Sequence, residues 1–230
     1  MDAKSKKRDA FTLAEVLITL GIIGVVAAIT FPTLIQKYHQ KAMENAFKKS
    51  YASLQTAVYS LSPDTYATLS GNVAGGSTEF FDDLLKQYKI TDNVTLGYYD
   101  VKTRIWEIKT YTQKSGSYNQ CAGLPSKIIY DGSAIGAWYN CLSTWIVIDT
   151  NGPLKAPNAL GHDIFYFTIS NKGKIIPVGS KSYNHWEMQG NSTYCSKNST
   201  NSQNGASCSG FAVENICPDN PEKSYWECLP

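Results

Sequence analysis

The apolar and polar positions divide the chain into one long apolar segment and a longer region with shorter periodicities. From Phe11 to Ile35 nearly every side chain is apolar, and Glu15 is the one ionisable residue. As a helix rising about 1.5 Å per residue, this segment is about 37 Å long, enough to cross a hydrocarbon core of roughly 30 Å. The pattern predicts a membrane-spanning helix over residues 11–35, kinked at Pro32 because proline removes a backbone hydrogen bond.

A single apolar stripe continues the helix beyond this segment. From residue 36 to about residue 62, apolar side chains recur every three or four positions, as on one face of a helix: Phe47, Tyr51, Leu54, Val58 and Leu61. Ser62-Pro63-Asp64 ends the pattern. We therefore expect one long bent helix whose second half packs on a folded domain.

After residue 77 the pattern changes from helical to alternating. Residues 78–88 predict a short capped helix with acids in its first turn. Strands are expected at residues 94–99, 104–112, 127–130, 134–139, 145–149, 164–170 and 175–178. Asp131-Gly132, between two of them, is a strong hairpin signal. The predicted fold class is α+β, with an antiparallel sheet packed against the second half of the long helix.

Composition narrows the functional classes. The chain of 230 residues has room for the helix and one domain, and its net charge of +2 is too small to indicate nucleic acid as the main ligand. His39, His162 and His185 lie far apart, and no P-loop, G-x-S-x-G or H-E-x-x-H motif is present. We expect no enzymatic activity, a surface position for His162 and a solvated helix face at Asp82 and Asp83.

The cysteines indicate an oxidising compartment. All six follow residue 120: Cys121, Cys141, Cys195, Cys208, Cys217 and Cys228. Many pairings are possible, and the simplest joins neighbours, 121 to 141, 195 to 208 and 217 to 228. Zinc is the competing use, but the spacings contain no C-x₂-C pair. The lysines and arginines on the two sides of the apolar helix do not settle its orientation, so the cysteines place the C-terminal part outside the cytoplasm.

Residues 184–230 are expected to form an irregular, cysteine-rich tail. Its Ser/Asn/Gly tract at residues 191–210 has a composition typical of disorder. Cys195 and Cys208 lie within this tract and indicate a stapled loop instead.

A short basic leader precedes the apolar helix. Residues 1–10 include Lys4, Lys6, Lys7 and Arg8 and end in the small residue Ala10. A conventional secretory signal has a shorter apolar run followed by a small-residue cleavage site. In this chain the small residue precedes the run, and the charged helical segment after the run has no such site.

A basic leader, a small residue and Phe-Thr-Leu-x-Glu at the start of an apolar helix resemble the class III signal of type IV pilins and type II secretion pseudopilins. The resemblance implies cleavage by a prepilin peptidase between Ala10 and Phe11, followed by methylation of the new amine. The family's usual residue before the cut is glycine, from which Ala10 departs. The implied organisation is a leader at 1–10, a transmembrane assembly helix at 11–35 and an exported pilin-like domain at 36–230.

The resemblance also gives Glu15 a partner. An unpaired charge within lipid is costly, and Glu15 of one subunit would pair with the Phe11 amine of its neighbour and fix their register. The implied function is a structural subunit of a type IV pilus or a type II secretion pseudopilus, anchored once in the inner membrane. Its partners would be the prepilin peptidase, an inner-membrane platform protein, sibling pilins or copies of itself, and membrane lipid.

Two simpler interpretations remain open. One is a plain signal anchor whose Glu15 side chain reaches toward the lipid headgroups. The other is a non-polymerising, membrane-anchored binding domain, which would keep the apolar helix but would not need Glu15.

The segment from Asp149 to Ile164 contains the last candidate site. Its D-x-N-G…P-N-x-x-G-x-D-I-F arrangement resembles a loop of pseudopilin-like sequences, and in some major pseudopilins C-terminal loops bind calcium. Asp149, Asn151 and Asp163 carry the oxygen ligands that calcium prefers. The alternative, which we prefer at this point, is an Asx-turn loop whose side chains bond their own backbone. No other cofactor is expected.

Overall fold

The computed structural model describes residues 12–64, 78–97, 105–115, 124–140, 143–170, 172–183 and 192–230. The chain forms two compact units, Met1–His39 and Gln40–Pro230. Helix α1 (Leu13–Tyr59) begins in the first unit and ends in the second, with Pro32 inside it. The predicted kink at Pro32 stays a prediction.

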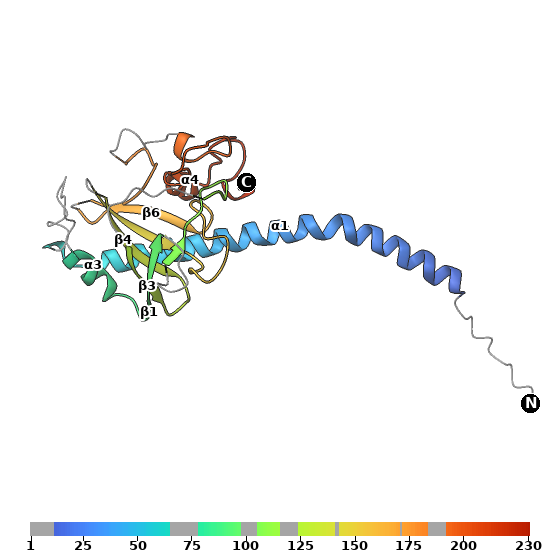
Figure 1. The fold of residues 1–230 in the computed structure, drawn as a ribbon, viewed down its shortest axis with the longest axis horizontal. Coiled ribbons are helices and arrows are strands. Elements are labelled where there is room, and N and C mark those ends of the chain that lie inside the picture. The colour runs from blue at the N-terminus through green and yellow to red at the C-terminus, as the bar shows by residue number, and fades with distance from the viewer. Residues whose placement is uncertain are drawn as a thin grey trace, which may run out of the picture. The chain divides into compact units, whose positions relative to one another are not determined.

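The second unit is built on a seven-stranded sheet (Figure 1). The strand order is β2-β1-β3-β4-β5-β6-β7, and every neighbouring pair is antiparallel except β1 and β2. The strands are β1 (Ile90–Gly97), β2 (Ile105–Glu107), β3 (Leu124–Ile129), β4 (Ala134–Asn140), β5 (Ser143–Asp149), β6 (Ile164–Ile169) and β7 (Ile175–Pro177). The predicted α+β class is confirmed.

The β3–β4 hairpin follows the turn chemistry of its sequence. Asp131 Oδ1 accepts hydrogen bonds from the backbone amide of Ser133, at 3.0 Å, and from its hydroxyl. Gly132 has φ +88°, a conformation that costs glycine little. The predicted hairpin is confirmed.

The two strands expected around residue 100 differ from the prediction. β1 begins at Ile90, before the predicted start, and β2 is only three residues long. The pair is parallel, with Thr95 opposite Ile105, so the expectation of a fully antiparallel sheet is wrong at this edge. The other side of β1 pairs antiparallel with β3. Alternation of apolar residues predicts a strand but not its direction.

Side chains on both faces of the sheet are buried. On one face, Phe165 and Phe167 pack in a core with α1 and α3 (Thr78–Leu85), and the ring centroids of Phe47 and Phe165 are 4.5 Å apart. On the other face, Val147 and Tyr166 pack in a second core against loop residues. Because successive side chains of a strand point to opposite faces, burial on both faces gives continuous apolar runs.

The predicted stripe on α1 is confirmed. Phe47, Tyr51, Leu54 and Val58 of α1 lie in the first core, fully or partly buried, and so does Leu61, two residues beyond the end of the helix. The C-terminal region adds the short elements η1 (Ser192–Tyr194), α4 (Cys208–Glu214) and η2 (Trp226–Cys228). Figure 1 shows α4 (red-brown) above β6, and the two elements are in contact. The expectation of an irregular tail therefore missed one short helix.

Candidate functional site

The N-terminal part of α1 is apolar and exposed on all sides. Leu17 is 61% exposed, Ile23 62% and Ile29 68%. Within the described part of the chain, α1 is the one helix long and apolar enough to cross a membrane. A helix that is apolar all round needs an apolar environment, supplied either by lipid or by other helices.

Threonine hydroxyls within this segment are satisfied by the helix itself. Thr19 Oγ1 donates to the Val16 carbonyl at 2.9 Å, Thr30 Oγ1 to the Val26 carbonyl at 2.9 Å, and Thr33 Oγ1 to the Thr30 carbonyl at 2.9 Å. A polar group without a partner is costly in hydrocarbon, so these bonds make the hydroxyls compatible with lipid.

Glu15 caps the start of its own helix. The backbone amide and the hydroxyl of Thr12 both donate to Glu15 Oε2 at 2.8 Å, and the Glu15 amide donates back to Thr12 Oγ1 at 3.3 Å. This reciprocal pattern is a capping box, which satisfies amides at a helix start. The spacing Thr12-x-x-Glu15 could have indicated it in the sequence. Ala10 and Phe11 lie outside the described residues.

The second candidate site is the loop between β5 and β6. Asp149 Oδ1 accepts from the amides of Asn151 at 3.2 Å and Gly152 at 2.8 Å. Asp163 accepts from the amides of Asn158 at 2.8 Å and Ala159 at 2.7 Å. The Asx-turn interpretation of Asp149 is therefore confirmed, and both acids organise the loop backbone.

The loop also contains buried oxygens without a hydrogen bond within the described structure. They are Asp149 Oδ2, Thr150 Oγ1, Asn151 Oδ1 and Asn158 Oδ1. Asp149 and Asp163 are themselves buried, and no grouping of three or more His, Cys, Asp or Glu among the described residues forms a metal site. Carboxylate and amide oxygens are nevertheless the ligands that calcium takes in proteins, so this donor set fits calcium. Asn158 was not among the residues expected from the sequence.

Both loop acids have raised pKa values. Burial and the neighbouring charge of Asp163 raise the pKa of Asp149 well above its ordinary value. Burial also raises the pKa of Asp163 to about 6, against the opposing hydrogen bonds from the loop amides. Two like charges close together in a buried site disfavour each other, and a cation between them would reverse that effect.

His162 is buried, so its expected surface position is wrong. The side chain is 3% exposed, and Nε2 lies 2.8 Å from the Tyr111 carbonyl. Burial lowers the pKa of His162, and the bond to the carbonyl opposes this effect in part. Tyr111 and His162 are 51 residues apart in the chain and come together only in the folded domain. The residues around position 162 therefore could not predict this contact.

Two of the expected disulfides lie in the described structure. Cys195 is bonded to Cys208 and Cys217 to Cys228, as neighbour pairing predicts. Cys121 and Cys141 lie outside the described residues. The stapled loop expected in the Ser/Asn/Gly tract is therefore present.

Residues 5–31 match the family described as the prokaryotic N-terminal methylation motif. This motif is the prepilin-type signal of type IV pilins and pseudopilins, and here it spans Ala10, Phe11 and Glu15. No curated protein and no solved structure matches the chain. The motif supports a processed, pilin-like subunit, which is a structural class of protein rather than an enzyme, and the apolar helix fits membrane anchoring.

Proposed function

We propose that the protein is a subunit of a pilus-like or pseudopilus-like filament. A prepilin peptidase cuts before Phe11, the new amine is methylated, and the helix at residues 11–35 holds the subunit in the inner membrane with residues 36–230 exported. The observation that carries the proposal is the methylation motif at residues 5–31, which includes most of the exposed apolar part of α1.

The exposed apolar helix explains why such a subunit would polymerise. In the membrane, lipid covers its side chains. Once the subunit leaves the membrane, the same side chains need other apolar helices as neighbours, because exposing them to water costs roughly 25 cal/mol per Å². A filament core made of these helices supplies that cover. The platform protein and sibling subunits are the partners that this step requires.

Glu15 has two possible uses in this scheme. In a filament its carboxylate pairs with the methylated amine of a neighbouring subunit, which sets the register. In a single chain it already caps α1 through Thr12, a use that needs no neighbour. The capping bond is the observation that favours the alternative, a non-polymerising anchored binding domain.

Substitutions at positions 12 and 15 separate these two uses. Glu15→Gln removes the charge but keeps a side chain that can complete a capping box, whereas Thr12→Val weakens the box and keeps the charge. We expect Glu15→Gln and Glu15→Ala subunits to insert and be cleaved but to disappear from the sheared filament fraction, as measured by immunoblot. Thr12→Val subunits should still assemble. Filaments formed by Glu15→Gln subunits would contradict the proposed pairing.

We also propose that the β5–β6 loop binds calcium through Asp149, Asn151 and Asp163, with Asn158 as a further ligand. Support comes from the buried oxygens without hydrogen bonds and from the two buried carboxylates beside them. Bound calcium would neutralise these acids and fix the loop between two core strands.

Calcium binding is testable by thermal unfolding of the full chain in detergent with calcium or with a chelator. A ligand at 100 times its Kd stabilises the folded state by about 2.7 kcal/mol, so we expect a higher Tm with calcium. Asp149→Asn should abolish this shift, whereas Asp64→Asn, at an exposed position outside the loop, should keep it. Equal Tm values with calcium and chelator in the unmodified chain would refute the site.

A further inference from the structure

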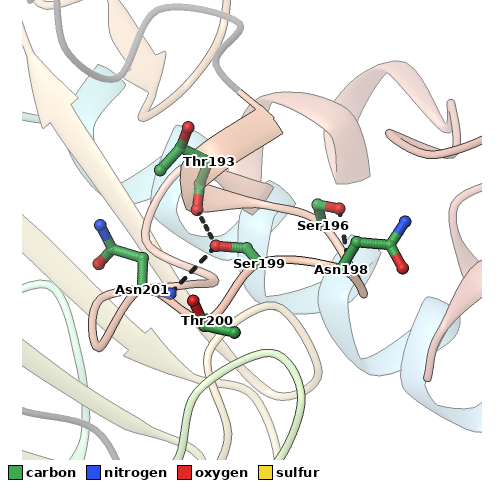
Figure 2. Close-up of a pocket in the computed structure, with 6 residues that line it drawn as sticks. All are labelled: Thr193, Ser196, Asn198, Ser199, Thr200 and Asn201. Carbon is green, nitrogen blue, oxygen red and sulfur yellow. Dashed lines mark hydrogen bonds between the residues drawn. The ribbon is translucent and has the colours of Figure 1, made fainter.

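The stapled loop carries a polar pocket on its surface (Figure 2). Its volume is about 490 Å³, and its lining consists of Thr193, Ser196, Asn198, Ser199, Thr200 and Asn201. All six side chains end in a hydroxyl or an amide, and none is charged or aromatic. The pocket therefore offers hydrogen-bond donors and acceptors and carries no charged group.

A buried asparagine fixes the backbone beneath this pocket. Asn204 is fully buried, and its Oδ1 accepts from the Ser196 amide at 3.1 Å. Its Nδ2 donates to the Ser196 carbonyl at 2.8 Å and to the Ser199 carbonyl at 3.3 Å. The Cys195–Cys208 disulfide closes the same loop. Binding to such a preorganised surface costs little ordering entropy.

A second contact holds the side of the loop at Ser196. The Asp219 carboxylate accepts from the Ser196 hydroxyl and, at 3.0 Å, from the Lys197 amide. The Ser196 hydroxyl in turn accepts from the Asn198 amide at 3.1 Å. These bonds use the Ser196 side chain and fix the position from which the Asn198 side chain extends.

Some of the remaining lining groups already form hydrogen bonds within the protein, and others do not. The Ser199 hydroxyl donates to the Thr193 carbonyl and accepts from the Asn201 amide at 3.2 Å, and Asn201 Oδ1 accepts from the Gln203 amide at 2.7 Å. The described structure gives no partner to the Asn198 carboxamide, the Thr200 hydroxyl or Asn201 Nδ2. Figure 2 shows the Asn198 and Asn201 side chains at opposite sides of the lining.

We propose that this pocket binds a neutral saccharide. Sugar hydroxyls both donate and accept hydrogen bonds, which matches the two amides and the hydroxyl that remain available. A charged ligand would find no countercharge in the lining, and an apolar ligand would leave the lining's hydroxyl and amide groups without partners. The volume lies within the roughly 300–1,000 Å³ usual for small-ligand sites. This site lies in the second unit and does not depend on filament assembly.

The probe is a panel of free neutral sugars: glucose, galactose, mannose, N-acetylglucosamine and N-acetylgalactosamine. The full chain, in zwitterionic detergent without sugar headgroups, is titrated by saturation-transfer NMR. Because no aromatic residue lines the pocket, we expect millimolar binding, near −4 kcal/mol. The double variant Asn198→Ala, Thr200→Val should weaken it about tenfold, as expected for the loss of two hydrogen bonds.

Ser202→Ala is the matched control. It removes an exposed hydroxyl from the same loop but outside the pocket, and it should leave binding unchanged. Intact disulfides by non-reducing mass analysis and an unchanged Tm show that each variant is folded. The proposal is overturned if none of the five sugars binds, if the double variant binds as well as the unmodified chain, or if N-acetylneuraminic acid binds and the neutral sugars do not.

Discussion

Single acidic side chains organise two distant parts of this chain through nearby backbone amides. Glu15 accepts from the Thr12 amide at the start of α1, and Asp163 accepts from the amides of Asn158 and Ala159 in the β5–β6 loop. In the sequence the same acids indicate a charge pair and a metal ligand. Since a side chain can serve both purposes, a substitution that preserves geometry and removes charge is needed to separate them.

Two glycines provide a residue-scale test of steric contact. Gly132 and Gly152 have similar positive φ values, +88° and +84°, but a Cβ on Gly152 would overlap the Gly132 carbonyl, whereas a Cβ on Gly132 would meet open space. Gly132→Ala should cost about 1–2 kcal/mol for the left-handed conformation alone. Gly152→Ala should cost clearly more, measured as a larger drop in Tm. Equal drops would mean that the loop and the hairpin are not in contact.

At the scale of elements, the sequence predicted those features that depend on residues close to one another in the chain. The stripe on α1 follows from residues three and four apart, and the β3–β4 hairpin follows from Asp131-Gly132, because both depend on neighbours in the chain. The parallel pairing of β2, the short helix α4 and the burial of His162 depend on contacts between distant segments. For the same reason the Asx turn at Asp149 was predictable, whereas the buried Asn158 oxygen beside it was not.

One ion pair links α1 to the β3–β4 turn and should make stability depend on pH. Lys49 Nζ lies 2.8 Å from Asp131 Oδ2. Burial acts to raise the pKa of Asp131, but hydrogen bonds from Lys49 and Ser133 outweigh it and lower the pKa. A lowered pKa stabilises the fold above the unfolded value of about 3.9 and loses that effect as the pH falls through the folded value.

The pair is partly exposed, so its contribution is small, about 0.5–1 kcal/mol. Lys49→Met should therefore lower the Tm at pH 7 by about 1–4 °C, and the difference should shrink as the pH falls below about 3.9 and through the lowered pKa of Asp131. Lys114→Met, which removes an exposed lysine with no ion pair in the described structure, is the control. A Tm difference that stays constant as the pH falls would point to packing of the Lys49 side chain instead.

At the scale of the whole molecule, the two units are suited to different environments. The second unit buries its apolar side chains in two cores, whereas the apolar side chains of α1 before His39 stay exposed. A chain of this kind needs an apolar environment for one part and water for the other. Cleavage of the basic leader is the step that would leave the apolar segment at the new N-terminus, ready to be covered first by lipid and later by neighbouring helices.

Cleavage depends on the residue before the cut, Ala10, so later assembly through the Phe11 amine depends on this residue too. Intact mass and N-terminal analysis of protein from membranes should give a methylated Phe11 start in cells with an active prepilin peptidase and a Met1 start in cells without it. Ala10→Gly supplies the family's usual residue and should be cut at least as completely, whereas Ala10→Leu should remain at Met1 because a bulky side chain replaces the small one. An unmodified chain that keeps Met1 beside an active peptidase would leave α1 as a plain anchor, and assembly through Phe11 and Glu15 would be excluded.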